Sequence, residues 1–144
     1  MVNTGSNTLS YDTCLIDNSG AFNAGGVGHI VGATTTLTLL DSKTLNSYST
    51  TSDGGIFNIL SSTKSTIKLY SRSLPTDTPP LKYTEHEQHS AYVNGGGYVI
   101  NSATIDMTII AMTKTLNSFA EKGAFLYTGP LVTSFYLYVE NALF

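Results

Sequence analysis

The residues Thr34-Thr35-Thr36-Leu37-Thr38-Leu39-Leu40 form the clearest β-strand signal in this 144-residue sequence. Many of their side chains are β-branched, and apolar residues partly alternate with hydroxyl-bearing ones, as on a strand with one buried face. No helical periodicity of apolar residues competes with this pattern elsewhere in the sequence. The stretch therefore predicts a fold built from β-strands.

Turn signals on both sides of this strand divide the sequence into short segments. Asp41-Ser42-Lys43 follows it directly, and Ser52-Asp53-Gly54-Gly55 contains the Asp-Gly pair that is the strongest hairpin signal in the chain. Comparable signals recur roughly every 8–12 residues, which is typical of sandwiches and barrels. We expect an all-β fold, an antiparallel β-sandwich of nine to eleven short strands, of the immunoglobulin-like, transthyretin-like or jelly-roll type. Ser118 and Glu121 match a helix capping box and predict at most one helical turn.

The length of the chain predicts a single β domain over residues 1–144. The only dense proline cluster, at residues 74–80, interrupts any sheet because proline lacks the N–H group that a ladder requires. We interpret this cluster as a long connection between sheets or as a boundary between two subdomains.

The composition excludes several classes of protein. Only 12% of the residues are charged, the net charge is -3, and seven Lys and Arg residues are too few for a nucleic-acid footprint. Apolar residues make up 41%, which is enough to bury a core and argues against disorder. The sequence is also short of the residues that build coiled coils and helical bundles.

The compartment is predicted from two observations that point in different directions. The first seven residues have neither a basic stretch nor an apolar run, so no secretory signal is predicted, and no segment approaches the roughly 18 apolar residues of a membrane span. Chains rich in Ser, Thr, Gly and Tyr and poor in charge are nevertheless typical of surfaces that work outside cells. A virion protein released by lysis reconciles the two, and an extracellular protein whose signal was removed is the alternative.

Two segments of the first half resemble a known family of modules. They are residues 31–41, which contain Val31-Gly32-Ala33 before the threonine-rich strand, and residues 49–59, in which Thr51, Gly55, Phe57 and Ile59 are the matching positions. Together they resemble the carboxypeptidase-regulatory-like (transthyretin-like) β-sandwich modules. Ser65-Thr66-Ile67-Lys68-Leu69-Tyr70 matches that family's later strand.

The resemblance covers residues 14–72 and departs from the family at Ser52 and Gly54, where the modules usually carry Asp. It implies an adhesion or scaffold module without catalytic activity. Similar modules also occur in bacteriophage virion proteins, which agrees with the compartment expected above.

Glu85-His86-Glu87-Gln88-His89 is the only cluster of residue types that bind metals. A metal site requires its ligands to converge on one point, whereas His86 and His89 would point to opposite faces of a strand. We therefore interpret the segment as a polar, exposed strand or loop and expect no metal. A site on a threefold axis, with three copies of His86 or His89, is the alternative.

Tyrosines are the candidate ligand or interface residues. In the segment 135–139, Phe135, Leu137 and Val139 share the strand face predicted to be core, and Tyr136 and Tyr138 share the other face. A tyrosine combines an apolar ring with a polar hydroxyl, which suits both sugar stacking and subunit interfaces. A surface ladder of tyrosines that only stabilises the sheet is the alternative. The candidates are Tyr98, Tyr127, Tyr136 and Tyr138.

No catalytic motif is present, so we expect no enzyme and no cofactor. We expect a structural or attachment protein of a bacteriophage virion, as a capsid decoration or tail-associated component. It would act as a homo-oligomer beside other virion proteins, because uncharged strands such as residues 131–139 aggregate unless they are buried. A closed ring such as a trimer would hide these edges. The alternative is a carbohydrate-binding module or lectin that binds cell-surface glycans through Tyr faces and Asn/Asp loops.

Overall fold

The computed structural model describes residues 5–72, 84–110 and 114–141, and every structural statement below concerns these residues. They form thirteen strands and contain no helix. The strands are β1 (Ser6–Asp12), β2 (Leu15–Asp17), β3 (Gly20–Ala21), β4 (Gly28–Leu40), β5 (Lys43–Leu45), β6 (Tyr48–Ser49), β7 (Phe57–Tyr70), β8 (Glu85–Glu87), β9 (Ser90–Ala91), β10 (Tyr98–Ile110), β11 (Lys114–Leu116), β12 (Leu126–Thr128) and β13 (Ser134–Glu140).

All pairing between these strands is parallel, so the expected antiparallel sandwich is wrong. Sheet A has the order β1-β4-β7-β10-β12, with β13 also paired to β10. Sheet B has the order β11-β8-β5-β2, and sheet C has the order β3-β6-β9. The strand-rich composition was interpreted correctly, but the partner of each strand is not its neighbour in sequence.

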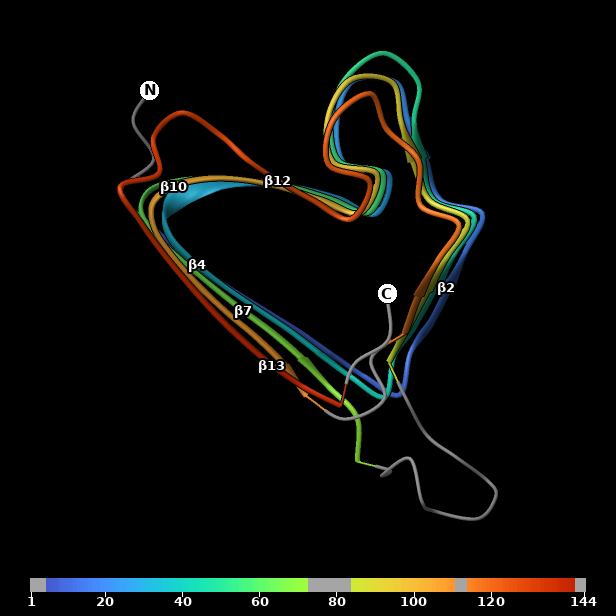
Figure 1. The fold of residues 1–144 in the computed structure, drawn as a ribbon, viewed down its shortest axis with the longest axis horizontal. Coiled ribbons are helices and arrows are strands. Elements are labelled where there is room, and N and C mark those ends of the chain that lie inside the picture. Colours follow the sequence, from blue (N-terminus) through green and yellow to red (C-terminus); the bar gives the residue numbers. More distant parts are fainter. Residues whose placement is uncertain (1–4, 73–83, 111–113, 142–144) are drawn as a thin grey trace.

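The chain winds as a stack of coils, and each of the first three coils contributes one strand to each sheet. The first coil holds β1, β2 and β3, the second β4, β5 and β6, and the third β7, β8 and β9. In Figure 1 the successive coils superimpose, because the view runs along the stack. This arrangement is a parallel β-helix, the kind of repetitive fold in which each layer contacts only the layers next to it.

Sheet A bends within its long strands and covers two sides of the stack (Figure 1). The bend coincides with a shift in register between Gly32 and Thr34 where β4 pairs β7, and between Ser102 and Thr104 where β10 pairs β7. A β-bulge of this kind bends a strand and re-aims its side chains. The bulges therefore let one continuous strand turn a corner of the coil.

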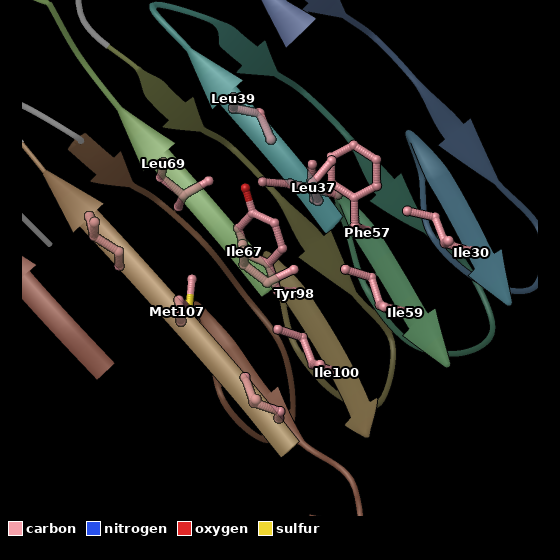
Figure 2. Close-up of a cluster of buried hydrophobic side chains, with 13 residues drawn as sticks. Ile30, Leu37, Leu39, Phe57, Ile59, Ile67, Leu69, Tyr98, Ile100 and Met107 are labelled. Atoms are coloured by element: carbon pink, nitrogen blue, oxygen red, sulfur yellow. The ribbon is translucent and has the colours of Figure 1, made fainter. Parts of the chain in front are cut away.

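Side chains that point into the stack form columns, with one residue from each coil. In sheet A, Leu9, Leu37, Ile67, Met107 and Leu137 share a column by register. The columns on either side start at Asn7 and at Tyr11 and end at Phe135 and at Val139. Figure 2 shows Leu37, Ile67 and Met107 on three neighbouring strands of the buried cluster. The columns through Leu9 and Tyr11 belong to the hydrophobic core, whereas the column that starts at Asn7 is polar at Thr35 and Ser65 and becomes hydrophobic at Ile105.

The turns between sheets contain residues with a positive φ. These turns change the direction of the chain from one sheet to the next without reversing it. Asn18, Asn46, Gln88 and Asn117 occupy the turn after β2, β5, β8 and β11, with φ between 51° and 57°. Gly25, Gly54, Gly95 and Gly123 occupy the turn that precedes sheet A, with φ between 60° and 70°. The hairpin expected at Asp53-Gly54 is therefore wrong, since Gly54 connects β6 of sheet C to β7 of sheet A.

The described residues test the helical turn expected at Ser118 but not the role of the proline cluster. The helical turn expected at Ser118 is wrong, because Phe119 forms a parallel bridge with Ser90 in the next layer of the stack. The proline cluster 74–80 lies outside the described residues. In sequence it falls between β7 of sheet A and β8 of sheet B, and the sheet A strands of the coils before and after it, β7 and β10, are direct neighbours.

Candidate functional site

The predicted tyrosines do not form one site. Tyr136 and Tyr138 lie on the outer face of β13, with 64% and 55% of their surface exposed. Tyr127 lies in β12 and is half-buried. Tyr98 is fully buried, because it lies in an inner column between Phe57 and Leu126 and stacks on the Phe57 ring at a centroid distance of 6.1 Å. Tyr98 therefore leaves the set of residues that an external ligand can contact.

His86 and His89 are both buried inside the stack, so the expected exposed polar strand is wrong. Strand β8 ends at Glu87, and the left-handed turn at Gln88, with φ 57°, brings His89 back to the side of His86. Their ring centroids are 6.0 Å apart. Strand alternation does not apply to His86 and His89, because the two residues are not on one continuous strand.

The two histidines belong to a buried polar chain. The backbone N–H of Ser47 donates to Nδ1 of His89 at 3.3 Å, so the neutral ring carries its proton on Nε2. That nitrogen lies 3.3 Å from Oγ1 of Thr44, which lies 2.6 Å from Nδ1 of His86. Nε2 of His86 lies 2.9 Å from the Tyr98 hydroxyl. The chain satisfies polar groups that would otherwise be unpaired in the core.

Burial strongly disfavours the charged form of both rings. It lowers the pKa of His86 to about 3, with a further contribution from His89, and it lowers the pKa of His89 to about 4. Both rings are therefore neutral at neutral pH. A proton on Nδ1 of His89 would also face the N–H donor of Ser47. The pair stabilises the interior and is not positioned for chemistry on an external substrate.

Two other kinds of functional element are absent from the part of the chain that the structure describes. No three residues among its His, Cys, Asp and Glu side chains lie close enough to hold a metal ion. Within the same residues, no helix has the length and apolar character that crossing a membrane requires.

The last strand of sheet A leaves its inner residues exposed. Phe135, Leu137 and Val139 continue the columns of Ile105, Met107 and Ile109, which are buried. Between 42% and 51% of the surface of the three β13 residues is exposed. The register confirms that these three residues face inward, but the prediction that they lie in the core is wrong, because they are exposed and no further strand of the described residues covers them. We call Phe135, Leu137 and Val139 the C-terminal end face.

The other end of sheet A has the same form. β1 pairs only with β4, and its inward residues Asn7, Leu9 and Tyr11 are half-buried at the start of the same three columns. We call these residues the N-terminal end face. Both end faces adjoin the outer edge of a parallel strand that pairs with no further strand among the described residues, and an edge of this kind is a template for another strand.

Two shallow grooves lie over sheet C, and they are lined by residues that were not among those predicted from the sequence. The larger, of about 340 Å³, is lined by Tyr48, Ser49, Thr50, Ser90, Ala91 and Tyr92. The smaller, of about 250 Å³, is lined by Gly20, Ala21, Phe22, Tyr48 and Thr50. Neither lining contains a carboxylate, histidine or cysteine. The signal in the sequence was weak, because these aromatic residues are isolated between small polar ones and become neighbours only through the coiling.

The fold and the residues above place the chain in the class of parallel β-helix proteins on topological grounds. Comparison with known proteins adds nothing more specific, since no family model matches the chain and neither a curated protein nor a solved structure is significantly similar to it.

Proposed function

We propose that this chain is a non-enzymatic structural module of an attachment assembly, in which copies stack end to end through their β-helices. The observation that carries the proposal is the pair of end faces at opposite ends of sheet A. Each presents residues of the same three inner columns, two of which are hydrophobic along their whole length, so one copy can continue the core of another. Burial of these side chains is the driving force.

The geometry favours head-to-tail stacking over a closed ring. A copy placed with β1 against β13 of its neighbour would extend sheet A by parallel pairing, with Leu9 following Leu137 in its column. The two surfaces in such a contact differ, so each added copy leaves a fresh end face exposed. An open stack, and not the trimer considered from sequence, is the assembly that we propose.

Repulsion between two carboxylates weakens the contact between stacked copies. Asp12 and Glu140 occupy the same outer column at opposite ends of sheet A, so they would meet across the joint between two copies. Asp12 is bound by Arg72, whose Nη2 lies 2.6 Å from Oδ2 of Asp12, and Glu140 accepts a hydrogen bond from Tyr138. Because like charges across a surface are screened by salt, we expect stacking to strengthen with ionic strength.

The setting that we propose is an exposed surface, and a virion in particular. The support is the outer face of sheet A, where Thr34, Thr36 and Thr38 of β4 and Thr104 and Thr108 of β10 are partly exposed hydroxyl positions.

Light scattering after gel filtration tests the stacking. The wild-type chain should exceed its monomer mass of 15.4 kDa at micromolar concentration, and the excess should fall on dilution. Leu137→Lys places a charge in the C-terminal end face and should give the monomer mass. Ser62→Lys is the matched control, because Ser62 is an exposed residue of β7, two strands away from both β1 and β13, and it should stack like the wild type. A wild-type mass of one chain at every concentration would contradict the proposal.

A further inference from the structure

Four exposed aromatic residues form a strip along sheet C, with one residue from each coil. They are Phe22, Tyr48, Tyr92 and Phe119, and between 41% and 76% of their surface is exposed. Tyr48 lies in β6, Phe22 and Tyr92 directly follow β3 and β9, and Phe119 bridges to Ser90 of β9. We call these four residues the aromatic strip.

The residues of the aromatic strip alternate between two columns. Tyr48 and Phe119 share a column with Gly20 and Ser90, because Gly20 pairs with Tyr48, Tyr48 with Ser90, and Ser90 with Phe119. Phe22 and Tyr92 lie one position beyond Ala21 and Ala91, on either side of Thr50. Rings in the same column are thus two coils apart, or about 9.5 Å at the usual spacing of strands.

Small residues between the rings create the two grooves over sheet C. One groove runs between Tyr48 and Tyr92 and the other between Phe22 and Tyr48, and both are lined by Thr50. Gly20 makes room for the Tyr48 ring, since a Cβ atom on Gly20 would lie 2.3 Å from Cζ of that ring. The Tyr48 ring of the second coil therefore lies across Gly20 of the first coil.

The chemistry of the strip is that of sugar recognition. Aromatic rings stack on the apolar face of a pyranose, while the hydroxyls of Thr50 and Ser90 can exchange hydrogen bonds with the sugar hydroxyls. The groove linings carry no charge, which suits a neutral ligand. The spacing of rings within one column is close to the length of a disaccharide unit in an extended β-1,4-linked chain, so every second sugar could meet a ring.

We propose that the aromatic strip binds an extended, neutral, β-1,4-linked glycan chain that runs parallel to the axis of the coil stack. The proposal deepens the attachment role proposed above and rests on it for the biological purpose of binding, but it does not depend on the stacking of copies. It assigns binding to sheet C, whereas the sequence had pointed to the tyrosines of β13.

Isothermal titration calorimetry with defined hexasaccharides tests the proposal. Cellohexaose or chitohexaose should bind the wild-type chain, and maltohexaose, an α-linked and curved chain, should bind much more weakly. Tyr92→Ala should weaken binding by roughly tenfold, as expected for the loss of one stacked ring, and Tyr92→Phe should retain most of it. Gly20→Ala should also weaken binding, because the new methyl group displaces the Tyr48 ring.

Tyr136→Ala is the matched control, because Tyr136 is an equally exposed tyrosine on β13, and it should bind like the wild type. Tyr92 is 71% exposed, so its replacement should leave the circular dichroism spectrum and melting temperature unchanged. The absence of binding to both β-linked hexasaccharides would overturn the proposal, as would equal binding of maltohexaose or an equal loss in Tyr136→Ala. Light scattering on the same samples separates this result from the stacking, since a monomer that binds contradicts only the stacking.

Discussion

Glycine residues at the turn before sheet A are required by the close approach of neighbouring coils. Gly26, Gly55 and Gly96 follow one another along the stack, and each faces a backbone carbonyl of the next coil. A Cβ atom on Gly55 would lie 2.0 Å from the carbonyl oxygen of Gly96. Because a backbone group cannot swing aside as a side chain can, any larger residue must push the coils apart.

The substitution Gly55→Ala should therefore lower the free energy of unfolding by roughly 1–3 kcal/mol, as overpacking does. Gly20→Ala is the matched control, because its Cβ meets only the end of the exposed Tyr48 side chain, and it should cost much less. Urea denaturation of both variants measures the difference. Equal losses in the two variants would show that contact between the coils is not the cause.

The buried histidines make the stability of the fold dependent on pH. The folded pKa values, about 3 for His86 and about 4 for His89, lie below the value of about 6.5 for an unfolded histidine. The unfolded chain therefore binds more protons below pH 6.5, so the stabilisation is complete above that pH and is lost as the pH falls toward 4. At pH 5 the loss is about 2 kcal/mol for each histidine.

Thermal melts between pH 7.5 and 4.5 test this dependence. His89→Gln should reduce it, because a glutamine can still accept from Ser47 and donate to Thr44 but does not titrate. His29→Gln is the control, since His29 is exposed, and should melt with the pH dependence of the wild type. A wild-type melting temperature that stays constant down to pH 5 would refute the neutral buried pair.

At the scale of elements, the inner columns predict a gradient of stability along the stack. Met107 of β10 is completely buried between Ile67 and Leu137 in its column. Leu137 of β13 continues that column but is half-exposed. Replacement by alanine should therefore lower the free energy of unfolding by very different amounts at Met107 and at Leu137.

Met107→Ala should lower the free energy of unfolding by about 2–5 kcal/mol, the range for buried truncations of this kind, and Leu137→Ala by less than about 1 kcal/mol. Chemical denaturation at submicromolar concentration, where stacking is minimal, gives both values. A loss at Leu137 as large as that at Met107 would mean that β13 is covered.

The sequence indicated most strand positions but none of the pairing. The strand expected at Thr34 to Leu40 lies inside β4, and the alternation in 135–139 assigned the faces of β13 correctly. Local propensity and period-two patterning define these features, and both are present in the sequence. Strand pairing depends on where the chain returns after each turn. The Asp53-Gly54 pair is compatible both with a hairpin, which reverses the chain, and with a corner between two sheets of a β-helix, which does not.

At the scale of the whole molecule, the repeat was the missing signal. Lys43-Thr44-Leu45-Asn46-Ser47 recurs as Lys114-Thr115-Leu116-Asn117-Ser118, and Gly-Gly pairs at 25–26, 54–55 and 95–96 mark the same turn in three coils. Self-similarity of this kind is typical of solenoids. The side chains facing the core vary between Leu, Ile and Met, and the eleven residues from 73 to 83 disturb the period, so the repeat is easily overlooked.

The candidate site residues could likewise be predicted only where a local sequence pattern defines them. The exposed tyrosines of β13 could be predicted, because two alternating residues on one strand define a face. The aromatic strip could not, because Phe22, Tyr48 and Tyr92 come together only when three coils are stacked in the observed register. A surface built from one residue per coil has no local pattern.

The central claim is that copies stack head to tail through the two end faces, and a disulfide cross-link tests it most directly. Ser10 of β1 and Tyr138 of β13 occupy the same outer column at opposite ends of sheet A. They cannot meet within one chain, because three strands separate them. In the proposed stack they would be neighbours across the joint at about 4.8 Å between Cα atoms, within the usual range for a disulfide.

The measurement is non-reducing electrophoresis of Ser10→Cys/Tyr138→Cys after mild oxidation, in a background of Cys14→Ser that removes the native thiol. We predict a ladder of covalent dimers, trimers and longer species that collapses to the monomer on reduction, whereas Ser10→Cys alone should give no ladder. A double variant that stays monomeric under conditions in which the wild type self-associates would contradict the head-to-tail stack.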